Sequence, residues 1–203
     1  MNFWDKIADK YSRRPIADEE AYNKKLEITR GYFRPDMDIF EFGCGTGGTA
    51  LLHAPYVKSV KAIDVSSNMI SIAKRKQKEM NINNIEFSVS GIDEYKFVDK
   101  SYDAIFGMSI LHLLEDKEAI IRKVHSSLTT GGFFITSTPC LHGIMKLFKV
   151  ILPIGRTFSF LPPIVKFFNT KELEQSITNN GFEIDHHWVV NDGRVVFIVA
   201  KKK

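Results

Sequence analysis

A glycine-rich loop that directly follows a short apolar segment constrains this chain more than any other feature. Residues 39–42 are apolar apart from Glu41, a pattern typical of a strand buried in a parallel sheet. Glycines then occupy every second position of residues 43–47, and glycine lets the backbone turn sharply and approach a ligand closely because it has no Cβ. Residues 48–53 can begin a helix. This order of strand, loop and helix predicts a nucleotide-binding turn.

The charge of Glu41 distinguishes between two kinds of nucleotide ligand. Gly43, Gly45 and Gly48 also satisfy the dinucleotide pattern G-x-G-x-x-G, in which an anionic pyrophosphate lies against the loop. Glu41 stands two residues before the first glycine and would repel that pyrophosphate, whereas it would attract the sulfonium and ammonium groups of S-adenosylmethionine. The sequence therefore favours an adenosylmethionine site over a nicotinamide site. The alternative is that Glu41 is a solvated residue at the end of a strand.

A second acidic residue follows the next apolar segment. Residues 60–63 are predominantly apolar and lead into Asp64, about 20 residues after the first glycine, which is the spacing of a carboxylate that accepts both ribose hydroxyls. Val65 and then Ser66 follow, and Ser66 can cap a helix that begins near residue 67. Asp64 could itself be a cap, but the glycine loop upstream favours ribose binding.

Together these motifs resemble those of the class I S-adenosylmethionine-dependent methyltransferases, in particular the small-molecule group that includes the ubiquinone and menaquinone biosynthesis enzymes. The resemblance covers residues 4–200 and implies S-adenosyl-L-methionine as the cofactor and methyl transfer as the activity. The matching segments are residues 41–47, Asp64 with Ser66, Met69 and Ile70, residues 101–108, residues 111–114, and residues 128–135 with Thr130 in place of the family's proline.

The resemblance also implies which residues contact the cofactor. These are Tyr11, Glu41, Gly43, Cys44, Gly45, Asp64, Val65, Met69, Ile92, Asp93 and Met108. Met69 can cover the adenine face or simply belong to the core. The family's third motif is altered, because Gly91 stands where an aspartate normally accepts from the adenine amino group. Asp93 or Ser90 could make this contact instead, and the Ile92 backbone N–H could bond a ring nitrogen.

Strand and helix patterns alternate along the rest of the chain, which predicts a parallel sheet with helices on both faces. Strands are expected near residues 38–42, 59–63, 85–89, 102–107, 132–138, 182–190 and 194–200, and helices near residues 46–53, 67–80, 117–128 and 170–179. The short link 191–193 contains Asp-Gly, a hairpin signal, so the last strand must run antiparallel to its neighbour. We therefore expect an α/β fold of the Rossmann-like, doubly wound type, with a mostly parallel seven-stranded sheet and an antiparallel C-terminal hairpin strand. At 203 residues, the chain is expected to form a single domain, residues 1–203.

The N-terminal region, residues 1–34, is predicted to be helical and to act as a lid. Trp4 and Tyr11 lie on one face of a first helix, Arg14-Pro15 ends it, and Asp18 starts a second. Trp4, Asp5 and Tyr11 also fit a lid pattern of the family that folds over the cofactor. The alternative is a plain amphipathic helix packed on the edge of the sheet.

A second expected cover is the apolar insertion at residues 140–169, which is rich in Leu, Ile, Phe and Pro. In this fold such insertions commonly build the acceptor pocket, so we expect a small and partly apolar acceptor. The insertion could instead only seal the site, or make a weak membrane-surface contact through residues 144–168, because lysines flank its apolar residues.

Two histidines are candidate catalytic bases. Methyl transfer from a sulfonium needs alignment and exclusion of water, and a general base helps where the acceptor is a hydroxyl or an acidic carbon. His112 follows the expected fourth strand and His142 the fifth, at the edge where open α/β sheets bind ligands. His112 could equally be a residue at the start of a helix.

Composition narrows the remaining classes of function. The net charge of +4 comes from scattered basic residues, which predicts no nucleic-acid partner, and the basic run 74–78 fits a solvated helix face. Cys44 and Cys140 are too few for a disulfide scaffold and no zinc spacing is present, so we expect no metal and a cytoplasmic location. No signal peptide or membrane-spanning segment is recognisable.

Two alternative functions remain. One is a non-catalytic adenosylmethionine-binding or partner-stabilising subunit. The other is an NAD-dependent oxidoreductase, although no Tyr-x-x-x-Lys pair follows the fourth strand. The acceptor, the methylated atom and the oligomeric state are not predicted.

Overall fold

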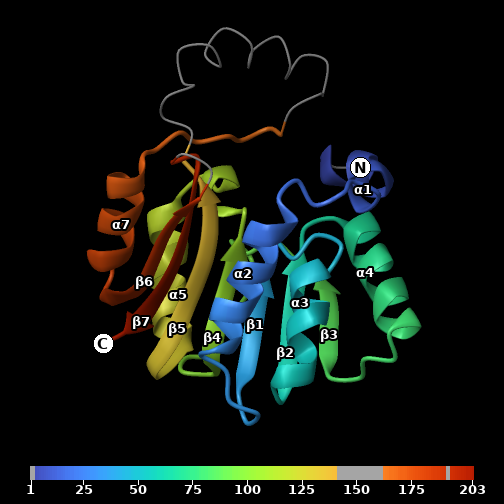
Figure 1. Cartoon of the computed structure of the whole chain (residues 1–203), viewed down its shortest axis with the longest axis horizontal. Coiled ribbons are helices and arrows are strands. Elements are labelled where there is room, and N and C mark those ends of the chain that lie inside the picture. Colours follow the sequence, from blue (N-terminus) through green and yellow to red (C-terminus); the bar gives the residue numbers. More distant parts are fainter. Residues whose placement is uncertain (1–2, 141–161, 191–192) are drawn as a thin grey trace, which may run out of the picture.

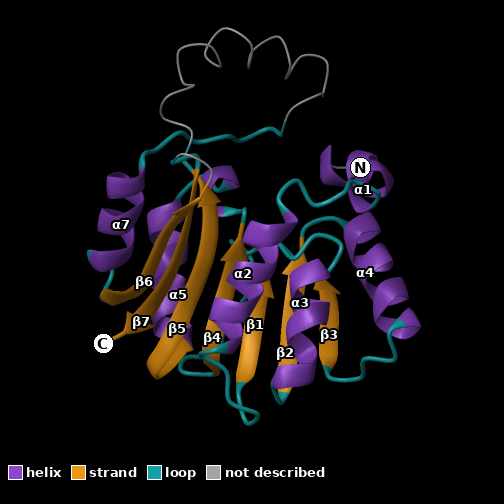
Figure 2. Ribbon diagram, viewed as in Figure 1, coloured by secondary structure: helices purple, strands orange, loops and turns teal. Residues whose placement is uncertain are grey.

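The computed structural model describes residues 3–140, 162–190 and 193–203, and these form a seven-stranded sheet covered by helices on both faces (Figures 1 and 2). The strand order is β3-β2-β1-β4-β5-β7-β6. The strands are β1 (Asp38–Phe42), β2 (Ser59–Asp64), β3 (Ile85–Val89), β4 (Tyr102–Met108), β5 (Leu128–Pro139), β6 (Phe182–Val190) and β7 (Val195–Lys202). The predicted doubly wound α/β fold is confirmed.

Helices connect the strands and cover both faces of the sheet, so the core has one layer on each face. They are α1 (Phe3–Ser12), α2 (Glu19–Arg30), α3 (Gly48–His53), α4 (Ser67–Glu79), α5 (Lys117–Ser127) and α7 (Thr170–Thr178), with 3₁₀ turns at Ala54–Tyr56 and Leu111–Leu113. Apolar residues of α3 and α4 pack on one face of the sheet with Ile39 and Phe106. Residues of α5 and α7 pack on the other face with Phe40 and Ile105. Consecutive side chains of a strand point to opposite faces, so each central strand contributes to both layers.

Polar side chains begin most of these helices where the sequence places a capping residue. The Asp18 carboxylate accepts from the Ala21 backbone N–H at 2.9 Å and starts α2. Ser66 caps α4 in the same way, as predicted, and Asn169 starts α7. Such caps satisfy backbone N–H groups that have no partner within the helix, which stabilises each helix end by about 1 kcal/mol.

The C-terminal hairpin breaks the parallel pattern as expected. β1, β2, β3, β4 and β5 pair in parallel, whereas β7 is antiparallel to both β5 and β6. The hairpin therefore inserts β7 between β5 and β6 and leaves β6 at the edge of the sheet (Figure 1).

Two expected element starts differ from the structure by two or more residues, and one short segment has a different conformation. The fifth strand was expected at residues 132–138 but begins at Leu128, which pairs with Tyr102 before the register shifts and resumes at Phe133. The two glycines between them absorb the irregularity, because Gly131 has a φ of +76° that other residues rarely adopt. The third helix begins at Gly48 rather than residue 46, after Gly47 in the left-handed region, and residues 111–113 form a 3₁₀ turn rather than the start of a helix.

Candidate functional site

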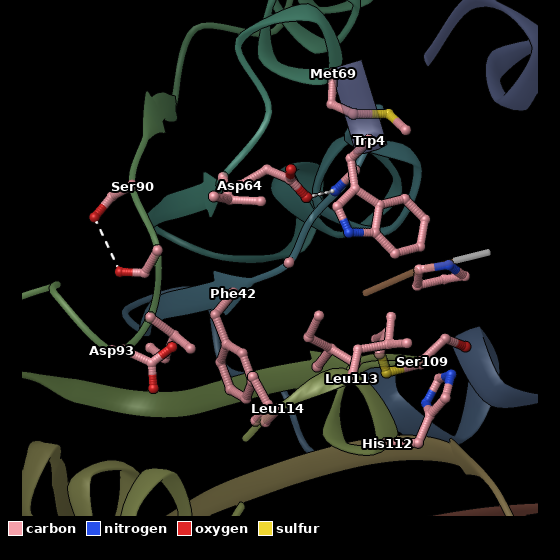
Figure 3. A pocket seen from close by; sticks show the side chains of 18 of the residues that line it. Trp4, Phe42, Asp64, Met69, Ser90, Asp93, Ser109, His112, Leu113 and Leu114 are labelled. Atoms are coloured by element: carbon pink, nitrogen blue, oxygen red, sulfur yellow. Dashed lines mark hydrogen bonds between the residues drawn. The ribbon is translucent and has the colours of Figure 1, made fainter. Parts of the chain in front are cut away.

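A cavity of about 440 Å³ opens at the carboxyl ends of the central strands (Figure 3). This volume lies within the ~300–1,000 Å³ typical of small-molecule sites. Its lining combines the glycine loop, the ends of β2 and β4, helix α1 and the segment after residue 161. The lining residues are Trp4, Tyr11, Phe42, Gly43, Gly45, Asp64, Val65, Met69, Ser90, Gly91, Ile92, Asp93, Met108, Ser109, Ile110, His112, Leu113, Leu114, Pro139, Pro162 and Val165.

The glycine loop forms one wall because its glycines allow a close approach that side chains would block. Gly43 has a φ of +64°, and a Cβ there would lie 2.8 Å from the Ile110 side chain. Gly45 also has a positive φ, and both of these glycines line the cavity. The loop therefore offers bare backbone to a ligand, as predicted from the sequence.

Asp64 anchors this loop and faces the cavity. One carboxylate oxygen accepts from the Gly45 N–H and the other from the Ser66 N–H, both at 2.9 Å. Burial raises the pKa of Asp64, and the two backbone N–H groups oppose that shift. Each oxygen retains acceptor capacity, so the residue can accept from a vicinal pair of hydroxyls such as those of ribose.

Glu41 and Cys44 do not line the cavity, unlike the other predicted cofactor residues. Glu41 is 3% exposed, and burial raises its pKa to about 8, opposed by a hydrogen bond from the Ala50 N–H. Without a ligand, its carboxyl group is therefore mostly protonated at neutral pH. A cation nearby would lower this pKa, so Glu41 carries the expected negative charge when a cationic ligand is bound. Burial likewise raises the pKa of the Cys44 thiol well above its usual range.

The altered third motif forms the end of the cavity near β3. Asp93 points a carboxylate toward the cavity, and the Ser90 hydroxyl donates to the Gly91 carbonyl at 3.1 Å (Figure 3). The Lys123 ammonium on α5 donates to the carbonyls of Ile92 and Asp93 at 2.8 and 3.0 Å. Lys123 therefore fixes this segment from behind. No motif in the sequence indicates Lys123, because its two contacts are to residues that lie 31 and 30 positions earlier in the chain.

The N-terminal helix lies against the entrance. Trp4 and Tyr11 line the cavity, while Asp5 attaches α1 to the start of α4. The Asp5 carboxylate accepts from the Ser66 hydroxyl at 2.6 Å and from the Asn68 N–H at 3.2 Å. Met69, one turn into α4, also lines the cavity and is 2% exposed.

His112 lies at the opposite end of the cavity, with Ser109 beside it (Figure 3). Its buried Nδ1 has no hydrogen-bond partner among the described residues, and burial lowers its pKa to about 4. The imidazole is therefore neutral at physiological pH. His142 and most of the 140–169 insertion lie outside the described residues.

The residues present fit the adenosylmethionine expected from the sequence. Asp64 and Asp93 supply acceptors for hydroxyl and amino groups, and the glycine loop supplies a backbone surface that a Cβ at Gly43 would obstruct. Apolar side chains such as Met69 and Ile92 line the same cavity. This combination suits a nucleoside, which presents polar edges and flat apolar faces.

Comparisons with known proteins agree with this geometry. Residues 39–132 match a family model described as a methyltransferase domain. The chain is 30% identical over 115 residues to phosphoethanolamine N-methyltransferase 2 of Caenorhabditis elegans, covering 55% of this chain and 26% of that protein. It is 28% identical over 159 residues to demethylmenaquinone methyltransferase of Oceanobacillus iheyensis, covering 69% of this chain and 67% of that protein. The chain also superposes on the crystal structure of geranyl diphosphate C-methyltransferase from Streptomyces coelicolor, with a TM-score of 0.73 and 17% identity. The superposition covers 91% of this chain and 79% of that one. That structure contains Mg²⁺, geranyl diphosphate and S-adenosyl-L-homocysteine.

The fold and the matched segment 39–132 both agree with a methyltransferase domain. The chain resembles the class I S-adenosylmethionine-dependent methyltransferases. It spans about a quarter of the worm relative and two thirds of the menaquinone relative. Within the described ranges, no helix combines the length and apolar character needed to cross a bilayer, and no cluster of three or more His, Cys, Asp or Glu residues could hold a metal ion.

Proposed function

We propose that this chain transfers a methyl group from S-adenosylmethionine to a small, partly apolar acceptor in the cavity described above. The observation that carries this proposal is the position of Asp64, whose carboxylate is fixed by the glycine loop and faces the same cavity as the neutral imidazole of His112. One end of the cavity thus suits a nucleoside, and the other has a base for an acceptor.

Each predicted cofactor residue has a role in this proposal. Asp64 accepts from the ribose hydroxyls, while the backbone of Gly43 and Gly45 lies along the cofactor. Asp93 accepts from the adenine amino group, with the Ile92 N–H beside the ring. Further contacts come from Tyr11, Val65, Met69 and Met108. Cys44 and Glu41 act from behind the loop, where Glu41 balances the positive charge of the cofactor.

The other end of the cavity is proposed to bind the methyl acceptor. When bound, adenosylmethionine supplies a methyl group already activated on a sulfonium. The chain has to exclude water, align the acceptor and remove its proton where the nucleophile is a hydroxyl or an acidic carbon. His112, whose neutral imidazole lines this end of the cavity, is the candidate for taking that proton. His142 is a second candidate base and lies outside the described residues.

The wider organisation follows the same proposal. Residues 1–34 form a lid and residues 140–169 a cap within one domain, and the cap can build the pocket wall, seal the site or contact a membrane surface. We expect a cytoplasmic enzyme without a nucleic-acid partner. The names of the relatives support small acceptors, because phosphoethanolamine and demethylmenaquinone are both small molecules.

Calorimetry with S-adenosylhomocysteine and with NAD tests the proposal. We expect the wild-type protein to bind the adenosyl compound and not NAD, and Asp64→Ala to weaken that binding at least tenfold, since a charge-assisted hydrogen bond contributes about 1.5–3 kcal/mol. Asp36→Ala is the matched control, because this exposed carboxylate pairs with Arg34 away from the cavity. Binding of NAD in place of the adenosyl compound would overturn the proposal. A screen with labelled methyl donor then identifies acceptors, and binding without turnover would favour a non-catalytic subunit.

A further inference from the structure

A partly buried ammonium group lies beside the acceptor end of the cavity. Lys25, on the sheet-facing side of α2, donates from Nζ to the Ser137 hydroxyl of β5 at 3.1 Å. Ser137 is 3% exposed. The contact joins residues 112 positions apart, so no local pattern in the sequence indicates it.

Strand register places this contact against the cavity wall. Ser137 is the partner of Met108 in the β4–β5 ladder, and its carbonyl accepts from the Ser109 N–H at 2.7 Å. Pro139, two residues further along β5, points to the same face as Ser137. Met108, Ser109 and Pro139 all line the cavity. Ser109 and His112 lie at the end away from Asp64 and Asp93 (Figure 3).

The charge of Lys25 is not balanced nearby. Lys25 forms no ion pair with any carboxylate of the described residues. Burial lowers the pKa of its ammonium group, and the charge of Asp18 at the start of α2 only partly opposes that shift. A buried charge without a counterion is unfavourable. A neutral amide could tie α2 to β5 equally well, so the charge itself calls for a partner.

The acidic residues that line the cavity all lie at one of its ends, so the two ends differ in charge. Asp64 and Asp93 lie at the proposed cofactor end, and the described lining of the other end contains no carboxylate. An anionic group would therefore be repelled from the first end and attracted to the second, where Lys25 lies behind the wall.

We infer that Lys25 and Ser137 form an anion subsite of the acceptor pocket, and that the acceptor carries a carboxylate or phosphate group beside its apolar body. This inference rests on the proposed function, since it assigns the acceptor to this end of the cavity. Neither Lys25 nor Ser137 lines the cavity, so the ammonium attracts the anionic oxygen from behind the wall, and the Ser137 hydroxyl orients the ammonium.

Matched small probes test the subsite. The protein is first saturated with S-adenosylhomocysteine and then titrated with benzoate, phenyl phosphate or benzamide, followed by NMR chemical shifts. Benzoate and benzamide have nearly the same shape and differ in charge. We expect the better of the two anions to bind at least tenfold more tightly than benzamide, which corresponds to about 1.4 kcal/mol. The ratio of the two anions distinguishes a carboxylate acceptor from a phosphate acceptor.

Three variants separate charge from structure. Lys25→Gln keeps a donor for Ser137 but removes the charge, so we expect its preference for the anion to fall below twofold. Lys25→Arg should retain the preference. Lys24→Gln is the control, because Lys24 is exposed and its ammonium lies over the Trp188 ring, 4.4 Å from the centroid.

The outcomes are distinguishable. Equal binding of benzoate, phenyl phosphate and benzamide to the wild-type protein, or an unchanged preference in a folded Lys25→Gln variant, would overturn the subsite while leaving the proposed function intact. If Lys25→Gln does not fold, Ser137→Ala replaces it, with the preference expected to fall severalfold. Failure of S-adenosylhomocysteine to bind would overturn the proposed function and the subsite with it.

Discussion

At the scale of single residues, the protonation state of Glu41 links cofactor binding to pH. Burial raises its pKa from an ordinary 4.5 to about 8, so the ligand-free protein holds a proton there at pH 7. A bound sulfonium and ammonium would lower that pKa, because an opposite charge favours the ionised form. Binding of adenosylmethionine at pH 7 should therefore release roughly one proton per molecule bound.

Calorimetry in buffers with different enthalpies of ionisation measures this proton. The apparent binding enthalpy of the wild-type protein should vary with the buffer, and Glu41→Gln should abolish the variation. Glu27→Gln, which changes an exposed carboxylate on α2, should leave the variation in place. A wild-type enthalpy that is the same in every buffer would show that Glu41 does not sense the cofactor charge.

At the scale of elements, Asp5 joins α1 to α4 and so holds the proposed lid. Its carboxylate accepts from the Ser66 hydroxyl at 2.6 Å and from the Asn68 N–H at 3.2 Å, at the positive end of the α4 dipole. Loss of these bonds should free α1, which carries Trp4 and Tyr11 over the cavity. We expect Asp5→Ala to accelerate dissociation of S-adenosylhomocysteine about fivefold, since exposed contacts of this kind contribute about 1 kcal/mol.

Stopped-flow displacement measures this dissociation rate, and limited proteolysis between residues 13 and 17 reports opening of the lid. Asp9→Ala is the control, because Asp9 lies on the exposed side of α1. If Asp5→Ala releases the ligand at the wild-type rate, α1 is a fixed cover and the alternative of a plain packed helix holds.

Features that depend on neighbouring residues could be predicted from the sequence, whereas contacts between distant residues could not. Local patterns identified each strand, the cap at Ser66, the hairpin near residue 193 and the acid at Asp64, because strand periodicity, capping and turn chemistry act over a few residues. Lys25 and Lys123 could not be predicted, because each contacts a residue far away in the sequence. Lys25 reaches from α2 to β5, and Lys123 reaches from α5 to the segment after β3. The protonation of Glu41 was also missed, because it depends on how completely the folded loop excludes water.

At the scale of the whole molecule, a buried histidine links stability to pH. His53 is 1% exposed at the end of α3 and packs edge-on against Phe33, with ring centroids 5.0 Å apart. Burial, and then the charge of Arg30, lowers its pKa from an ordinary 6.5 to about 3. The unfolded chain takes up a proton below pH 6.5 whereas the folded state does not, so stabilisation is complete above pH 6.5 and is lost as the pH falls toward 3.

This single site should cost about 2 kcal/mol of unfolding free energy between pH 6.5 and pH 5. His112 contributes in the same direction, because burial lowers its pKa to about 4. Glu41 contributes in the opposite direction, since a carboxyl group with a raised pKa loses stabilisation as the pH rises from 4.5 toward 8. Urea unfolding at pH 6.5 and pH 5 should therefore show a smaller loss for His53→Gln than for the wild-type protein, even if the variant is less stable at both values. An identical loss in the two proteins would mean that His53 exchanges protons with solvent in the folded state, and that the layer between α3 and β4 is more open to water than its packing implies.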